Sequence, residues 1–226
     1  MASAKEPEKF QWYTLKLSLF ILAIFALQNI FPDSFEPFAL ASSQVLFQPW
    51  SIVTYMFLHG NFSHIFSNLF SLVLFGFILE KIIGSRNFLL VFFSAGIISG
   101  TVSIFFYYSV IGASGAIFGI LGVLAVTRPK MVVPAFGIPI PMIAAVVMWA
   151  FLDLAGTFYP SSIANVGHLA GLAAGITIGL WLRPKYKLPE KKKEDKIKLD
   201  KECFKKWEEK YIKKINYSVS RWDLKP

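Results

Sequence analysis

Charged residues are scarce in this chain of 226 residues: they make up only 16% of it, whereas 55% of the residues are hydrophobic. An average soluble domain carries about 25% charged residues. The few charges gather near the two ends of the chain and leave the middle almost without them. This distribution excludes an ordinary soluble domain. It also excludes a disordered chain, which combines low hydrophobicity with high net charge.

Cysteine is almost absent, since Cys203 is the only one. A single cysteine excludes a small secreted domain held together by disulfides. The chain also lacks the helical zinc-binding string His-Glu-x-x-His, which argues against a catalytic zinc site built from its three histidines. Internal repeats of 20–50 residues, the mark of a solenoid, are missing as well.

Long apolar runs are what the sequence does contain. A helix needs roughly 20 apolar residues to cross a hydrocarbon core of about 30 Å. Six stretches are predicted to be spans: Trp12–Phe31, Ile65–Ile83, Phe88–Tyr108, Ser114–Thr127, Ile138–Tyr159 and Ala164–Leu182. The fourth would rise only about 21 Å and cannot cross alone. The sequence therefore predicts an all-α polytopic membrane protein, a bundle of six transmembrane helices with a short recessed fourth helix.

Three parts of the chain follow from this pattern: a polar lead of residues 1–11, a six-span domain of residues 12–183 and a basic tail of residues 184–226. No small-residue cleavage site follows the first apolar stretch, so we expect a retained span and not a removed signal peptide.

The segments between spans differ in charge. Those predicted to face outward are residues 32–64, 109–113 and 160–163, and they contain no lysine or arginine. Positively charged segments stay on the cytoplasmic side of a membrane. We therefore expect a multi-pass protein of the cell membrane with both termini in the cytoplasm.

The tail holds 15 basic and 8 acidic residues. Its larger apolar residues fall on one helical face: Ile197, Phe204, Trp207, Tyr211 and Ile215. A basic amphipathic helix beside a membrane is predicted to rest on the anionic inner leaflet of the lipid bilayer or on the inner face of the protein itself. Because topology already explains the positive charge, nucleic acid is not expected as a partner.

Polar residues inside membrane spans are candidates for chemistry. Ser114 opens the recessed fourth span, in Gly112-Ala113-Ser114-Gly115. A serine at this place is most often only an N-cap. Here the recess would put its hydroxyl below the membrane surface, beside free backbone N–H groups that suit a developing oxyanion.

Glycine ladders indicate which spans pack closely. Two spans carry them: Gly115, Gly119 and Gly122 in the fourth, and Gly167, Gly171, Gly175 and Gly179 in the sixth. Small residues let helix backbones approach in a membrane. The two ladders would bring Ser114 beside His168 as a nucleophile and its general base. The prediction is a Ser–His dyad, because no carboxylate is evidently placed to orient His168. Asp153 is expected to line a wet cavity or satisfy a helix end.

His64 and Asn68 lie four residues apart and share one helix face. They could form ordinary hydrogen bonds between helices, or they could be donors to an oxyanion.

Three motifs, taken together and in order, resemble the rhomboid intramembrane serine proteases, in the compact six-span form found in prokaryotes. The motifs are His64-x-x-x-Asn68, Gly112-x-Ser114-Gly115 and Gly167-His168-x-x-Gly171-x-x-x-Gly175. The resemblance covers roughly residues 12–183. It implies that Ser114 is the nucleophile and His168 the base, and that His64, Asn68 and the backbone N–H of Ser114 form the oxyanion site.

The reaction implied by the resemblance is hydrolysis of a peptide bond in or near a transmembrane segment of a membrane-protein substrate, close to the outer face. No metal or organic cofactor is implied. Two positions depart from the family's pattern. Ser51 follows Trp50 where many members have arginine, so we expect aromatic residues to anchor the loop instead. Phe118 stands where some members have tyrosine, and its ring could still stack on His168.

Two other classes compete with a protease. A non-catalytic rhomboid-like adaptor or chaperone would bind membrane helices without needing a paired Ser114 and His168. A small transporter often shows an internal repeat with paired broken helices, whereas only one predicted span is short.

Overall fold

The computed structural model describes residues 10–135, 137–159, 163–184, 205–206 and 208–210. The chain divides into two compact units, Met1–Lys187 and Leu188–Pro226. The apolar face predicted for the tail lies outside the described residues. Every candidate site residue lies in the first unit.

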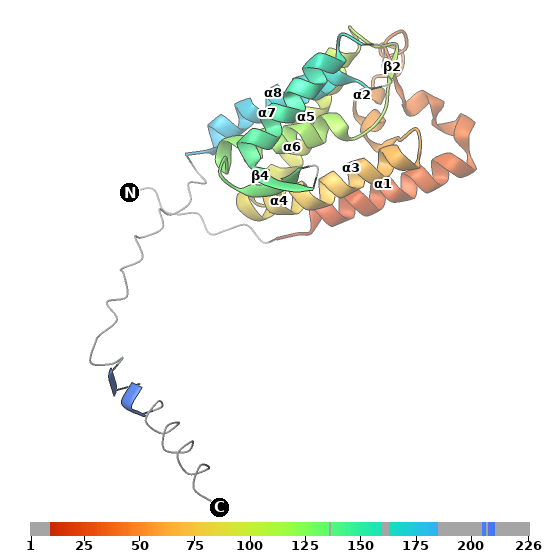
Figure 1. Cartoon of the computed structure of the whole chain (residues 1–226). Helices are drawn as coiled ribbons and strands as arrows, with labels where there is room; N and C mark the ends of the chain where they lie inside the picture. Colours follow the sequence, from red (N-terminus) through yellow and green to blue (C-terminus); the bar gives the residue numbers. More distant parts are fainter. Residues whose placement is uncertain (1–9, 136, 160–162, 185–204, 207, 211–226) are drawn as a thin grey trace, which may run out of the picture. The chain divides into compact units, whose positions relative to one another are not determined.

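The first unit is mostly helical, as the sequence predicts (Figure 1). Its main helices are α1 Tyr13–Ile30, α3 Phe62–Ser71, α4 Phe77–Ile83, α5 Ser85–Ser103, α6 Ser114–Thr127, α7 Met142–Gly156 and α8 Asn165–Leu182. A π-helical segment, η3 Leu72–Gly76, joins α3 to α4, so that Phe62–Ile83 forms one long helix. The predicted fold class of a polytopic helical membrane protein is confirmed.

Within the described part of the chain, four helices are long and apolar enough to cross a membrane: Tyr13–Ile30, Phe62–Ile83, Ser85–Ser103 and Asn165–Leu182. Two apolar helices are shorter, α6 with 14 residues and α7 with 15. The bounds predicted for α6 are confirmed.

The bounds predicted for the fifth span are wrong, because residues 138–141 belong to a hairpin instead. Strands β3 Val132–Ala135 and β4 Ile138–Pro141 pair antiparallel. Apolar side chains made Ile138–Pro141 look like part of a span, but the prolines at 139 and 141 have no N–H to give to a helix. α7 therefore begins at Met142, and two apolar helices are short where the sequence predicted one.

α6 runs through the middle of the unit (Figure 1). Ten of its 14 residues are buried, and they lie between Gly115 and Ala125. The helix is apolar on every face, as expected for a helix that other elements enclose. Glycines bring its neighbours close. A Cβ atom on Gly119 would collide with Ala95 of α5, and one on Gly175 of α8 would collide with the backbone of Gly119. The predicted contact between the two glycine ladders is confirmed.

The loop between α1 and α3 is tied to the segment that precedes α6. Strand β1 Leu40–Ala41 pairs antiparallel with β2 Ser109–Val110. In η2 Tyr55–Phe57, the carbonyl of Tyr55 accepts the backbone N–H of Gly112 at 2.8 Å, and its hydroxyl donates to the carbonyl of Gly96 at 2.7 Å. The loop, which also holds η1 Pro32–Phe38 and α2 Ser51–Thr54, is thus fixed against α5 and α6 without an arginine after Trp50.

A buried carboxylate holds the start of α1. Glu80 of α4 accepts four hydrogen bonds: from the backbone N–H groups of Tyr13 and Thr14, from the Thr14 hydroxyl and from the Ser85 hydroxyl, all at 2.7–2.9 Å. Backbone N–H groups at a helix start have no partner within the helix. Glu80 therefore caps α1 from another helix, a role that the sequence did not reveal.

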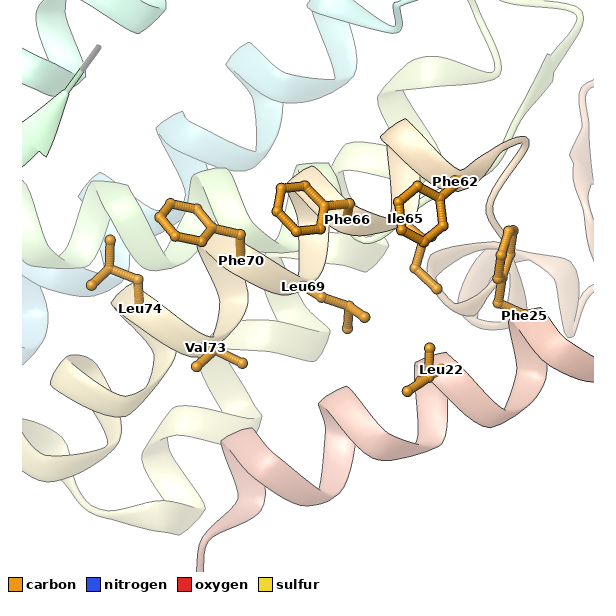
Figure 2. A pocket seen from close by; sticks show the side chains of 9 residues that line it. All are labelled: Leu22, Phe25, Phe62, Ile65, Phe66, Leu69, Phe70, Val73 and Leu74. Carbon is orange, nitrogen blue, oxygen red and sulfur yellow. The ribbon is translucent and has the colours of Figure 1, made fainter. Parts of the chain in front are cut away.

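Large apolar side chains cover the outside of the unit. Phe62, Phe66 and Phe70 stack at four-residue intervals along α3, with ring centroids 6.2 and 6.4 Å apart. They line an apolar groove whose other side includes Leu22 and Phe25 of α1 (Figure 2). Exposed rings of this kind suit contact with lipid tails.

Candidate active site

Ser114 is the first residue of α6, and its hydroxyl does not cap the helix. The N-cap position belongs to Ala113, which makes no side-chain cap. Ser114 Oγ instead lies 2.8 Å from Nε2 of His168 on α8. The structure thus brings together the two residues that the sequence paired, and it excludes the reading of Ser114 as a simple cap.

Gly112 shapes the approach to Ser114. Its φ of 118° lies in the region that side chains avoid, and a Cβ atom there would come within 2.7 Å of His64 Nε2. Glycine at this position allows the turn into α6 and leaves room for the imidazole of His64. The His64 ring therefore faces Gly112, which lies two residues before Ser114 along the chain.

The His168 ring contacts Ser114 at one edge and the Phe118 ring on one face. Phe118, one turn after Ser114 on α6, stacks on it with ring centroids 4.5 Å apart and planes 9° from parallel. The predicted stacking is confirmed. Because Phe118 sits on the same helix as Ser114, it fixes the plane of the imidazole relative to the hydroxyl.

Asp153 of α7 is the residue that the sequence did not place in the site. Its Oδ1 lies 3.1 Å from Nδ1 of His168, on the opposite edge of the ring from Ser114. The expectation that no carboxylate orients His168 is therefore wrong. Both side chains are largely withdrawn from solvent, with 13% of His168 and 11% of Asp153 exposed.

His64 and Asn68 occupy neighbouring turns of α3. Asn61 caps this helix by accepting the N–H of His64 at 2.8 Å, and the Gly60 N–H points at His64 Nδ1 across a longer 3.5 Å. A neutral His64 whose Nδ1 accepts this contact would carry its proton on Nε2, the nitrogen that faces Gly112. This is the tautomer that an oxyanion donor needs.

Asn68 is buried, and its Nδ2 donates to the carbonyl of His64 at 2.9 Å on the same helix. Its Oδ1 has no hydrogen-bond partner among the described residues. The structure thus brings His64 to the start of α6 but engages Asn68 within its own helix. The oxyanion role of Asn68 stays a prediction.

His59 packs behind His64. The two rings meet edge to face, with centroids 4.9 Å apart. His59 is 1% exposed, and its ring nitrogens make no well-formed hydrogen bond among the described residues, although the backbone of Phe57 lies close to the ring. Burial, and next the nearby His64, lower the pKa of His59 to about 4. The His59 ring is therefore uncharged at neutral pH and packs against the His64 ring as an uncharged group.

No group of three His, Cys, Asp or Glu side chains that could hold a metal ion occurs among the described residues. The polar groups that meet at the start of α6 are a hydroxyl bonded to an imidazole, a carboxylate behind that imidazole, and backbone N–H groups at a helix start. Such an arrangement is suited to nucleophilic attack on a carbonyl group.

Residues 46–185 match the family model of the Rhomboid domain. This match covers more than half of the chain and includes Ser114, Asp153 and His168. The chain belongs to the rhomboid family.

Similar proteins carry the same family name. The chain is 36% identical over 131 residues to "Rhomboid protease GluP" of Bacillus subtilis (strain 168), covering 56% of this chain and 24% of that protein. It is 30% identical over 178 residues to "Rhomboid protease GlpG" of Yersinia pseudotuberculosis serotype I (strain IP32953), covering 74% of this chain and 62% of that protein. It thus spans 24% to 62% of the length of these relatives.

The rhomboid domain as matched begins at residue 46, after α1, although α1 is tied to it through Glu80. All three motifs that carried the resemblance lie inside the matched residues. The family assignment from sequence is confirmed.

Proposed function

We propose that this rhomboid is an intramembrane serine endopeptidase that hydrolyses peptide bonds in or near transmembrane segments of membrane proteins. The observation that carries the proposal is the 2.8 Å contact between Ser114 Oγ and His168 Nε2. This is the hydrogen bond that a nucleophile and its general base must make. The relatives' names, which call them rhomboid proteases, support the same activity.

The first step is attack by Ser114 on the scissile carbonyl. His168 Nε2 takes the hydroxyl proton as the Ser114 oxygen bonds to the carbonyl carbon, and the carbonyl oxygen becomes an oxyanion. His168 then gives the proton to the leaving amine, which departs and leaves an acyl-enzyme. Water, activated by the same imidazole, hydrolyses the ester and restores Ser114.

The oxyanion would form against donors at the start of α6. The backbone N–H of Ser114 has no partner within the helix, and the helix end carries a partial positive charge. His64 supplies a second donor through Nε2, and Asn68 supplies a third once its amide turns toward the substrate. Loss of one such donor typically lowers kcat by about 10²–10³-fold.

The site is proposed to open toward the outer face of the cell membrane, with the N- and C-termini in the cytoplasm. Ser114 and His168 lie at the starts of α6 and α8, both of which run inward in this topology. The segments on that side carry no lysine or arginine. Substrates would be transmembrane proteins that reach the site from the bilayer, and no cofactor is required by these steps.

Labelling with a fluorophosphonate tests the proposal, because this probe reacts with activated serines. The full chain is purified in detergent, treated with the probe and digested, and the adduct is located by mass spectrometry. We expect one adduct, on Ser114, that is lost in Ser114→Ala and reduced to background in His168→Ala. Both variants should keep the melting temperature of the wild type within a few degrees.

The competing function is that of a rhomboid-like adaptor that binds membrane helices without cutting them. An adaptor has no need of an activated hydroxyl. A folded, monodisperse wild-type protein that takes up no probe and leaves single-span membrane proteins uncut would favour the adaptor. Equal labelling of wild type and His168→Ala would contradict the assignment of the base.

A further inference from the structure

Two carboxylates are buried among the described residues of the first unit, and they differ in how many hydrogen bonds they accept. Glu80 accepts four hydrogen bonds and joins α1, α4 and α5. The side chain of Asp153 makes one polar contact, between its Oδ1 and Nδ1 of His168. Its buried Oδ2 has no hydrogen-bond partner among the described residues. A buried acceptor without a partner costs free energy. Stability therefore accounts for Glu80 but does not account for Asp153.

The contact of Asp153 fixes which nitrogen of His168 carries a proton. A carboxylate is an acceptor only, so the bond at Nδ1 requires an N–H there. Nε2 is then left with its lone pair directed at Ser114 Oγ, 2.8 Å away. This is the tautomer in which the imidazole can take the hydroxyl proton. In the other tautomer Nε2–H would face the hydroxyl and could not act as a base.

The imidazole of His168 is surrounded by groups from three other helices. Ser114 and Phe118 come from α6, Asp153 comes from α7, and His64, which interacts electrostatically with His168, comes from α3. Asp153 is the one negatively charged group among them. When His168 becomes an imidazolium during attack, this carboxylate at 3.1 Å is placed to stabilise the new charge in a site largely closed to water.

We infer that Asp153 is a positioning residue, which selects the His168 tautomer and converts the predicted dyad into a Ser114–His168–Asp153 triad. The inference rests on the proposed function, since a base has meaning only where Ser114 is a nucleophile. The residue added to the site comes from α7, a helix that contains none of the three sequence motifs. Asp153 touches no substrate and acts through His168 alone.

Three variants test this inference in the full chain: Asp153→Ala, Asp153→Asn and Asp153→Glu. The matched control is Asp33→Asn, which removes an exposed carboxylate from the loop between α1 and α3. The rate of fluorophosphonate labelling is measured against probe concentration, which separates the maximal rate from the half-saturating concentration. Melting temperatures show that each variant is folded.

We expect the maximal labelling rate to fall by at least about 10²-fold in Asp153→Ala and Asp153→Asn, since loss of the matching carboxylate in a soluble protease costs about 10⁴-fold. The half-saturating concentration should stay unchanged, because Asp153 does not contact the probe. Asp153→Glu should recover a large part of the rate, and Asp33→Asn should behave as wild type. Wild-type rates in a folded Asp153→Asn would overturn the inference.

A second measurement does not depend on activity. The chain has only three histidines, so a spectrum of protein labelled with ¹⁵N-histidine can be assigned by replacing them singly. We expect His168 to show a protonated Nδ1 in the wild type and to lose this signature in Asp153→Ala. The same tautomer in both proteins would overturn the inference. If wild-type protein shows the Asp153-dependent tautomer yet takes up no probe, the proposed protease function fails while the role of Asp153 in holding the imidazole stands.

Discussion

The carbonyl oxygen of Gly115 on α6 occupies the place that a Cβ atom on Gly171 of α8 would need. The two backbones therefore touch one residue after Ser114 and three residues after His168. The contact that packs the helices also sets the distance between the nucleophile and its base. The site depends on glycine here for close approach and not for backbone flexibility.

Gly171→Ala should damage activity more than stability. The added methyl group must push α8 away from α6, at a cost of about 1–3 kcal/mol for overpacking. Displacement of the base by about 1 Å can lower a rate by about 10²-fold, so we expect a loss of that order in fluorophosphonate labelling. Gly60→Ala is the control, since its methyl group would meet only Ile111 at 3.6 Å. Unchanged labelling in a folded Gly171→Ala would contradict the argument.

The pairing of α6 with α8 could be predicted because it depends on periodicity alone. Glycines every fourth residue mark one face of a helix, whichever way the helix is turned in space. Ser114 and His168 stand at the starts of the two ladders, so a contact between the ladders brings them to the same depth. The sequence therefore predicts this part of the site and the bounds of α6.

Asp153 could not be placed in the same way. It lies 15 residues before His168 on a different helix, and its contact depends on how α7 is rotated about its own axis. α7 has no glycine ladder to fix that rotation from the sequence. The hairpin of β3 and β4 was missed for a related reason, since hydropathy cannot separate an apolar strand from an apolar helix end.

Glu80 is expected to be a stability residue with no part in the chemistry. Glu80→Ala would leave the N–H groups of Tyr13 and Thr14 and two hydroxyls without their acceptor. Each buried donor left without a partner costs about 1–3 kcal/mol, so we expect a loss of at least about 4 kcal/mol for the four donors, seen as a lower melting temperature in detergent. Glu36→Gln, at an exposed acid, should melt as wild type. An unchanged melting temperature in Glu80→Ala would show that α1 does not need this cap.

Phe118 is expected to hold the plane of the His168 ring. Aromatic stacking contributes about 0.5–1.5 kcal/mol, so Phe118→Ala should lower the labelling rate by up to about tenfold. Phe118→Tyr keeps the ring and should stay near the wild-type rate. Phe106→Ala removes an exposed phenyl group elsewhere and serves as the control. The stacking role fails if Phe118→Tyr is as slow as Phe118→Ala.

His59 should make the stability of the protein depend on pH. Its pKa is lowered from 6.5 to about 4 because burial disfavours the charged ring. Between these values the unfolded chain binds more protons at this residue than the folded chain does, so stability rises with pH. The stabilisation is present in full above pH 6.5 and is lost as the pH falls toward 4.

Replacement of His59 by phenylalanine should remove this dependence. The ring would still fill the space beside His64, and only the weak contact of the His59 ring with the backbone of Phe57 would be lost. We expect His59→Phe to be at least as stable as wild type at pH 7 and to gain on it steadily below pH 6.5, by up to about 3 kcal/mol near pH 4. Melting temperatures of both proteins across pH 4–7.5 in one detergent provide the measurement. Groups far from His59 titrate alike in both proteins and cancel in the difference, whereas His64 is coupled to His59, so the same comparison is made in a His64→Gln background. Parallel curves would show that His59 is charged in the folded state or reached by water, and the packing of an uncharged His59 ring against His64 would have to be abandoned.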